Sequence, residues 1–338
     1  MTPFAAPGRR SIGLLLVGVI ALAAGALGAS FGSSPLRLHD VIAVLAGGGD
    51  AATRGIVLDF RVARVLLAAC VGAALASAGA AYQAVLRNPL ADPFILGVSG
   101  GAALGAVAFI ALNPASGMGD SIARPAAAFV GAVVTLVALF AIARFQGRTE
   151  TTALLLTGVV LNALDSATIQ FLISTGDPAR FQGTMSYLMG AMNAPSWAAL
   201  AIVATLSGFG IAVLGTQAHT LNLLTLGDDE AAQLGVAVDR ARWLIVLAAS
   251  LVTAAAVAFT GIIGFVGLIV PHAMRSLFGA DHRVLLPASA LAGAAMLILA
   301  DAAARTFIAP AELPVGVVTA LIGGPFFLVL LMKRLRAS

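Results

Sequence analysis

The run SIGLLLVGVIALAAGALGAS, residues 11–30, decides the fold class of this chain. It holds no charged residue, and a helix of about 20 apolar residues is long enough to cross the hydrocarbon core of a bilayer. Arg9 and Arg10 precede it, which is also the pattern of a cleavable signal peptide. Because nine further apolar runs follow, we expect a retained first membrane helix.

The composition extends this expectation to the whole chain. Sixty per cent of the residues are hydrophobic and only 10% are charged, with a mean hydropathy of +1.02. Soluble domains carry about 25% charged residues, and a transmembrane barrel would alternate in segments of about 10 residues. The sequence therefore predicts an all-α, polytopic membrane protein forming one domain over residues 1–338. The ten predicted spans are residues 12–31, 62–86, 94–112, 125–145, 151–174, 196–216, 242–260, 262–278, 284–303 and 313–332.

Charge and residue usage exclude several functions. A net charge of +4, scattered along the chain, argues against a nucleic-acid partner, and the single cysteine, Cys70, excludes an internal disulfide. The only lysine is Lys333, so a phosphate-binding loop of the G-x-x-x-x-G-K-[ST] type cannot exist. If ATP drives this protein, a separate subunit binds it, and we expect no cofactor, metal or catalytic residue in this chain.

The distribution of basic residues predicts the orientation. With the N-terminus inside, twelve of the 19 Lys and Arg residues fall on the inner side and seven on the outer side. Because cytoplasmic loops are enriched in Lys and Arg, we expect both termini in the cytoplasm. The outer, periplasmic loop 32–61 is predicted to hold a short helix from Asp40 to the glycines that follow. Four arginines between residues 32 and 64 oppose the bias and therefore need another role.

The long inner loop, residues 217–241, has the character of a docking surface. It reads QAHTLNLLTLGDDEAAQLGVAVDRA and is half apolar, unlike a solvated linker. Asp228 or Asp229 is predicted to cap a short helix that runs through Leu234, with Gly235 at its C-terminal side.

Glycines on the third span predict close helix packing. Gly97, Gly101 and Gly105 recur every fourth residue and share one helical face. In lipid, where packing rather than water exclusion holds helices together, small residues let two backbones approach.

Two polar residues lie in the middle of the fifth span. Asp165 is one helical turn from Asn162, and intramembrane ionisable residues usually face an interior or an aqueous cavity. Two interpretations stay open: a polar patch of a transport pathway, or hydrogen bonding between helices. An ion-coupled carrier remains an alternative, although a proton-coupled one normally needs more partners than this single acid.

Two other kinds of site are possible on motif grounds. GVSG, residues 97–100, has the G-x-S-G pattern of intramembrane serine proteases, with Ser99 as nucleophile and His272 as base. His272, Asp281 and His282 could suggest a metal, but they lack the i, i+4 spacing that puts two ligands on one helical face. A four-residue motif has low specificity, so neither alternative is preferred.

Charged residues gather at the outer ends of the predicted spans. Asp301 and Glu312 flank Arg305, and together with Arg61 and Arg64 they are predicted to form an exposed charged rim. Exposed ion pairs contribute little stability, whereas guanidinium groups bind carboxylates of a partner in a bidentate manner.

Several long motifs in a fixed order resemble the permease subunits of ABC importers for iron–siderophores, haem and vitamin B12, the FecCD-type family. The stretches that carry the resemblance are LRNPLADPFILGVSGGAALGA (86–106), LNLLTLGDDEAAQLGV (221–236), GIIGFVGLIVPHAMRSLFGADHRVLLPASALAGA (261–294) and LADAAARTFIAPAELPVGVVTALIGGPFFLVLL (299–331). The resemblance implies ten transmembrane helices, a homodimer, two cytoplasmic ATPase subunits that bind ATP and magnesium, and a substrate-binding protein outside a bacterial cytoplasmic membrane. The cargo stays open among iron–siderophore, haem and cobalamin.

The resemblance also implies roles for particular residues. RVAR, residues 61–64, is similar to the family's Arg-Leu-Pro-Arg motif, which with Arg305 would dock the binding protein. The fifth span, with Asn162 and Asp165, would line the translocation pathway, and the eighth would surface at Pro271. The residues implied in ATPase coupling are Leu224, Leu226, Gly227, Asp228, Asp229, Glu230, Ala231, Leu234 and Gly235.

Overall fold

The computed structural model describes residues 7–32, 38–113, 122–144, 151–309 and 311–337. Within these ranges every regular element is helical, as the sequence predicts. In lipid a helix satisfies all its backbone hydrogen bonds internally, which favours this fold class. In the part of the chain that the structure describes, seven helices are long and apolar enough to cross a membrane. They are α1 (Pro7–Ser30), α4 (Ala63–Val85), α6 (Ala123–Ala143), α7 (Thr151–Thr175), α9 (Trp197–Thr216), α12 (Val238–Thr260) and α14 (His282–Thr306).

Within the described residues, three further apolar helices fall where the other three spans are predicted. They are α5 (Val98–Leu112), α13 (Val266–Phe278) and α15 (Val315–Ala337). The remaining elements are short: α2 (Leu38–Leu45), α3 (Ala51–Gly55), η1 (Ile56–Val62), η2 (Pro93–Leu96), α8 (Pro178–Leu188), α10 (Ala218–Leu224) and α11 (Asp228–Gln233).

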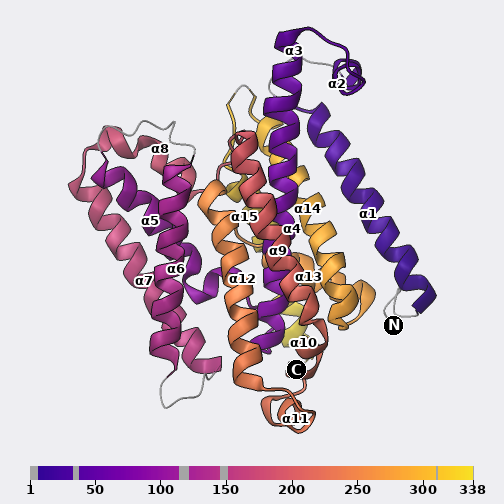
Figure 1. Ribbon diagram of the computed structural model, residues 1–338, viewed down its shortest axis with the longest axis vertical. Coiled ribbons are helices and arrows are strands. Elements are labelled where there is room, and N and C mark those ends of the chain that lie inside the picture. Colours follow the sequence, from indigo (N-terminus) through magenta and orange to yellow (C-terminus); the bar gives the residue numbers. More distant parts are fainter. Residues whose placement is uncertain (1–6, 33–37, 114–121, 145–150, 310, 338) are drawn as a thin grey trace.

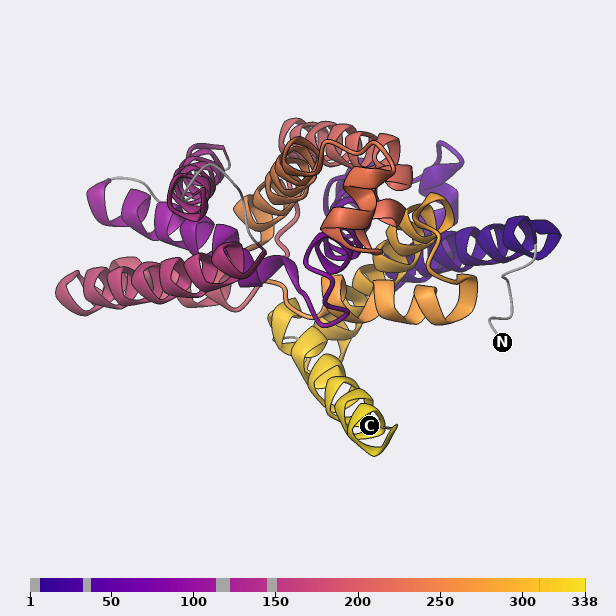
Figure 2. The same cartoon turned by 90° about the horizontal axis from the view of Figure 1, so that it is seen from below.

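The helices stand roughly side by side between two ends that differ in their short elements (Figure 1). One end, which we call the α11 end, holds α10 and α11, the start of α1 and the end of α15. The other, the α3 end, holds α2, α3 and α8. Seen from below, α1, α15 and the group α5–α7 project from a central body in three directions (Figure 2).

The central body is formed around α4 and α12. In the apolar window of the helical segment 51–85, 78% of the residues are buried, and in that of α12 72% are buried. The corresponding fractions are 28% for α1 and 22% for α7. The projecting helices therefore offer most of their surface to lipid or to another protein chain.

Glycine contacts hold the central helices at short distance. A Cβ added to Gly72 would lie 2.2 Å from the carbonyl oxygen of Gly293, so α4 and α14 touch through their backbones. The predicted packing face of α5 is confirmed for two of its glycines, because a Cβ on Gly101 would lie 2.8 Å from Gly131 O and one on Gly105 2.3 Å from Ala127 O, both in α6. Gly97 instead precedes α5 with φ of 84°.

Pro271 lies inside α13 rather than at its surfacing end, so that expectation was wrong. The helix continues to Phe278. A proline inside a helix removes the hydrogen bond to the carbonyl four residues earlier, here that of Gly267. The Nε2 group of buried Gln83 on α4 donates to Gly267 O at 3.3 Å and to Leu268 O at 3.2 Å. The helix tolerates the proline because a neighbouring side chain supplies the missing donor.

The largest departure from the predicted boundaries is at the start of the second span, while the starts of α5, α12 and α13 each differ by four residues. The second span does not begin at residue 62, because one helical segment runs through α3, η1 and α4 from Ala51 to Val85. Its middle part, η1, is a π-helix, a rare form often found at functional sites. In addition, the connection between α7 and α9 contains the helix α8, which the sequence did not predict. The predicted helix after Asp40 exists as α2, although part of its loop, residues 33–37, lies outside the described residues.

Candidate functional site

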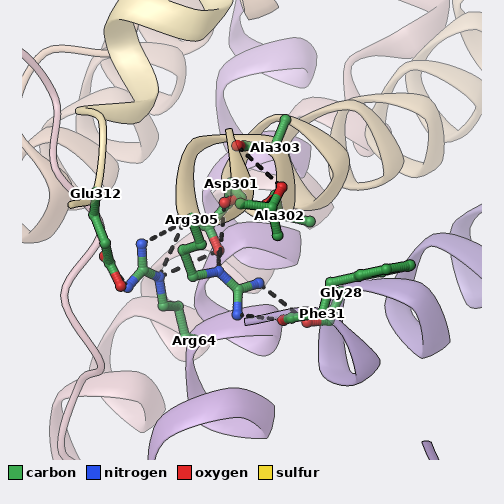
Figure 3. A network of polar contacts seen from close by, with 9 residues as sticks. Gly28, Phe31, Arg64, Asp301, Ala302, Ala303, Arg305 and Glu312 are labelled. Carbon is green, nitrogen blue, oxygen red and sulfur yellow. Dashed lines mark hydrogen bonds and ion pairs between the residues drawn. The ribbon is translucent and has the colours of Figure 1, made fainter. Parts of the chain in front are cut away.

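Five charged residues from the α3 end form what we call the arginine cluster: Arg61, Arg64, Asp301, Arg305 and Glu312. Arg64 Nε lies 3.0 Å from Asp301 Oδ1 and Arg64 Nη1 lies 2.8 Å from Glu312 Oε2. Arg305 Nε, one helical turn after Asp301, lies 3.1 Å from Asp301 Oδ2 (Figure 3). One carboxylate therefore pairs with two guanidinium groups and joins α4 to α14.

Arg61 and Arg305 also bind the last turn of α1. Arg61 Nη1 donates to the carbonyl of Ser30 at 3.0 Å. Arg305 donates to the carbonyls of Gly28 and Phe31, both at 3.0 Å. The last four carbonyls of a helix have no partner within it, and that end carries partial negative charge. The two arginines therefore cap α1 and fix it to η1 and α14.

The arginine cluster is largely buried, so the expected exposed rim was wrong in that respect. Arg61 and Arg305 are 4% exposed and Asp301 is 0% exposed. The side chain of Arg64 is 12% exposed and that of Glu312 is 39% exposed. A cavity of about 540 Å³ opens beside the cluster. Its lining residues are Gly32, Ile56, Phe60, Arg61, Arg64, Asn193, Ala194, Arg305 and Glu312.

At the opposite end, α10 and α11 form the segment that we call the coupling segment, residues 218–235. The predicted short helix exists as α11, but Asp228 and Asp229 are its first two residues, and its N-cap is Gly227, with no side-chain cap. Asp228 instead accepts hydrogen bonds from Arg242 Nη2 at 2.7 Å. This bond explains why the predicted Asp cap is absent, because the carboxylate of Asp228 fastens α11 to α12 instead of capping its own helix.

The coupling segment presents both apolar and acidic side chains. Leu224 and Ala231 are buried, whereas Leu226 and Leu234 are each 60% exposed. Gly227 and Gly235, with φ of 140° and 88°, make the tight turns at both ends of α11. Asp229 and Glu230 are exposed between the two leucines. Nearby, a polar cavity of about 630 Å³ is lined by Arg87, Thr151, Thr152, Asp228, Asp229, Glu230, Ala232, Val238, Asp239 and Arg242.

Asn162 and Asp165 point from α7 toward α5. Asn162 Nδ2 donates to the carbonyl of Phe94 at 2.8 Å. Asp165 is 7% exposed, and a Cβ added to Gly100 would lie 3.1 Å from its Oδ2 and 2.6 Å from Asn162 Oδ1. Asn162 therefore hydrogen-bonds to η2 of the same chain, which fits the interpretation of bonding between helices, whereas Asp165 Oδ2 is buried with no hydrogen-bond partner among the described residues.

The residues of the protease and metal alternatives are not assembled into sites. Ser99 Oγ and His272 Nδ1 are both buried without a hydrogen-bond partner, whereas a serine nucleophile needs a base within hydrogen-bonding distance. Within the described residues, no three His, Cys, Asp or Glu side chains form a group that could hold a metal ion. Asp281 and His282 instead both contact Asn222 of α10.

Sequence reasoning missed Asn222 as a site residue. Its partners are 59 and 60 positions away in the chain, so no local pattern marks it. Asp281 carried a signal, because an Asp directly before an apolar helix is a typical N-cap. It does cap α14, through a hydrogen bond from the backbone of Arg283 at 3.1 Å.

The fold and these clusters define a polytopic helical membrane protein with a structured, partly apolar segment at one end and a buried ion-pair cluster at the other. The chain belongs to the FecCD transport family, whose model matches residues 15–333.

Named relatives come from several organisms. The chain is 48% identical to the cobalamin import system permease protein BtuC of Halobacterium salinarum, over 82% of this chain and 74% of that protein. It is 42% identical to the hemin transport system permease protein HmuU of Yersinia pestis, over 82% and 83%. It is 36% identical to YfhA of Bacillus subtilis, named for siderophore transport, over 95% and 94%.

A solved structure shares the fold. It is described as an inward-facing conformation of a metal-chelate type ABC transporter, with a TM-score of 0.83 and 30% sequence identity. The match covers 96% of this chain and 99% of the other.

Proposed function

We propose that this chain is the transmembrane permease subunit of an ATP-binding-cassette importer that takes up a metal chelate by alternating access. Its family and its relatives named for cobalamin, hemin and siderophore transport support the proposal. The observation that carries it is the coupling segment, in which exposed Leu226 and Leu234 flank an acidic helix. Because the chain lacks a phosphate-binding lysine loop, we assign ATP and magnesium to a partner subunit.

We further propose the complete arrangement. Ten helices cross a bacterial cytoplasmic membrane, with the α11 end and both termini in the cytoplasm. Two copies of the chain form a homodimer, two ATPase subunits bind the coupling segments, and a substrate-binding protein docks at the α3 end. The start of α1 and the end of α15 lie at the same end of the molecule as α11, which supports this orientation (Figure 1). ATP and the binding protein would then favour different states of one two-state equilibrium.

The translocation path is assigned to the space between the two copies, beside α7. The outward face of α7 exposes Val159, Val160, Leu164 and Phe171. Asn162 and Asp165 would position this wall from behind, since Asn162 bonds to Phe94 O on η2 and both side chains face Gly100 of α5. The cargo class is an iron–siderophore, haem or cobalamin, in keeping with the names of the relatives.

Reconstitution tests the proposed function. We expect proteoliposomes that hold the permease, its ATPase and its cargo-binding protein to accumulate labelled chelate only when ATP is on the ATPase side. Ferric siderophore, haem and cobalamin would be compared in parallel to identify the cargo. Accumulation in ATPase-free vesicles under a proton gradient would instead establish an ion-coupled carrier and contradict the proposal.

Docking of the binding protein is tested at Arg64. We expect Arg64→Gln to weaken binding of that protein at least about tenfold, because Arg64 would pair with one of its carboxylates. Removing one partner of a charge pair that an interface buries costs about 2–5 kcal/mol, and about 1.4 kcal/mol is tenfold in affinity. Arg64 is chosen because its side chain is more exposed than that of Arg305. Binding would be measured by interferometry on monodisperse protein in nanodiscs.

Arg54→Gln is the control for this measurement. Arg54 is at the same end but outside the cavity, where its Nε donates to Gly48 O at 2.8 Å. Equal affinities for Arg64→Gln, Arg54→Gln and the unaltered protein would remove the docking assignment.

A further inference from the structure

A compact group of hydrogen bonds joins the coupling segment to α14. The Oδ1 atom of Asn222 on α10 accepts from the backbone N–H of His282 at 2.8 Å and lies 2.7 Å from its Nδ1. The Nδ2 atom of Asn222 donates to Asp281 Oδ1 at 2.9 Å. Both ends of one amide are therefore used, and reversing the amide would place its donor group against the N–H of His282. The network fixes the orientation of Asn222.

The partners of Asn222 are themselves held firmly. His282 is 1% exposed, and Asp281 caps α14 through Arg283 N. Arg10 Nη1 of α1 lies 3.2 Å from Asp281 Oδ2. Partial burial acts to raise the pKa of Asp281, but the hydrogen bonds from Asn222 and Arg283 and the charge of Arg10 hold it below its ordinary value. Asp281 is therefore an ionised anchor that binds α1, α10 and α14 together.

The helix that begins at this anchor ends in the arginine cluster. α14 has 25 residues, which corresponds to a length of about 37 Å at about 1.5 Å per residue. Asp301 and Arg305 lie in its last two turns, and Arg305 caps α1 there. α1 and α14 are thus tied to each other at both ends, by Arg10 and Asp281 at one and by Arg305 at the other. Two elements held at both ends move as one body.

We propose that Asn222 is a positioning residue that fastens the coupling segment to α14, so that a displacement of α10 and α11 is transmitted along α14 to the arginine cluster. This inference rests on the proposed function, because it needs an ATPase that moves the coupling segment. Contact between α11 and the ATPase would not by itself transmit this displacement to α14. Without the Asn222 bonds, α11 could still bind the ATPase while α14 failed to follow, and ATP would be consumed with less cargo moved.

A donor–acceptor exchange tests the proposal. Asn222→Asp removes the donor and puts a second carboxylate beside Asp281. Adding Asp281→Asn in the same chain restores the bond in the opposite direction, because the amide introduced at position 281 can donate to the carboxylate introduced at position 222. In that orientation the amide nitrogen takes the place of Oδ1, to which Arg283 N also donates at 3.1 Å, so the double variant regains the bond to position 222 but loses this cap of α14. We expect Asn222→Asp to lower cargo imported per ATP hydrolysed at least fivefold, and the double variant to return within twofold of Asp281→Asn alone. The readout is uptake and phosphate release in the same proteoliposomes.

Two further variants keep the test decisive if Asn222→Asp folds poorly. Asn222→Ala removes the bonds without adding charge and is expected to lower the ratio at least threefold. Asn113→Ala removes an exposed asparagine at the end of α5, whose Nδ2 donates to Phe109 O at 3.0 Å, and is expected to leave the ratio unchanged. A ratio in Asn222→Ala and Asn222→Asp equal to that of the unaltered importer, with only a lower melting temperature, would overturn the inference. Absence of ATP-driven import in the unaltered protein would instead overturn the proposed function.

Discussion

Replacing Asp301 with alanine is expected to lower the free energy of unfolding by about 3–5 kcal/mol, the usual effect of removing one partner from a buried ion pair. Asp301 is 0% exposed and lies 2.9 Å from Arg64 Nη2 and 3.1 Å from Arg305 Nε. Its removal leaves Arg305 without a carboxylate and Arg64 with Glu312 alone. Thermal unfolding in detergent, followed by the monodisperse fraction after heating, would measure the loss.

The matched control is Glu312→Gln. Glu312 also pairs with Arg64, at 2.8 Å, but its side chain is 39% exposed. Exposed ion pairs contribute about 0–1 kcal/mol, so we expect a small shift in melting temperature. If Asp301→Ala and Glu312→Gln shifted it equally, the arginine cluster would not be a buried structural junction.

The arginine cluster also marks the limit of what the sequence could predict. The charges and their end of the molecule followed from hydropathy, because they flank apolar runs. Their burial did not, since the groups that bind Arg61 and Arg305 include the backbone carbonyls of Ser30 and Gly28. Every residue has a backbone carbonyl, so no side-chain pattern indicates which carbonyl a distant arginine will bind.

The positions of the long helices also followed from hydropathy, but their exact ends did not. The apolar runs located the long helices, and glycine spacing located the α5–α6 contact. Hydropathy measures how apolar a segment is rather than where its helix ends, so the continuation of α4 back through η1 and α3 escaped prediction. α8 was not predicted either, because its sequence PARFQGTMSYL is not apolar and hydropathy therefore does not mark it.

The coupling segment was predicted best where its own residues decide the structure. Gly235 has positive φ and follows α11, as predicted, whereas Gly227, which also has positive φ, stands where an Asp cap was predicted. The connection that we propose to matter most, from Asn222 to Asp281, joins residues far apart in the chain. It depends on the packing of α10 against α14, which a single sequence does not encode locally.

A second large effect is expected at Gly79, in the middle of α4. A Cβ at this position would lie 1.9 Å from the carbonyl oxygen of Gly267 and 2.5 Å from its carbon. Both are backbone atoms of α13, and the same carbonyl is the one that Pro271 leaves free and Gln83 binds. Neither helix can yield without breaking that bond. Overpacking costs about 1–3 kcal/mol and occasionally more, and we expect Gly79→Ala to reach the top of this range and Gly79→Leu to yield no monodisperse protein.

Gly25→Ala is the matched control, because it makes the same change where nothing lies within 4 Å of the added Cβ. Gly25 is also inside a helix, α1, where alanine is favoured over glycine by about 1 kcal/mol. We therefore expect its melting temperature to equal or exceed that of the unaltered protein. Size-exclusion profiles and melting curves of the three variants would be recorded in the same detergent. A Gly79→Ala protein as stable as Gly25→Ala would mean that α4 and α13 do not meet backbone to backbone, and the account of how the chain accommodates Pro271 would fail with it.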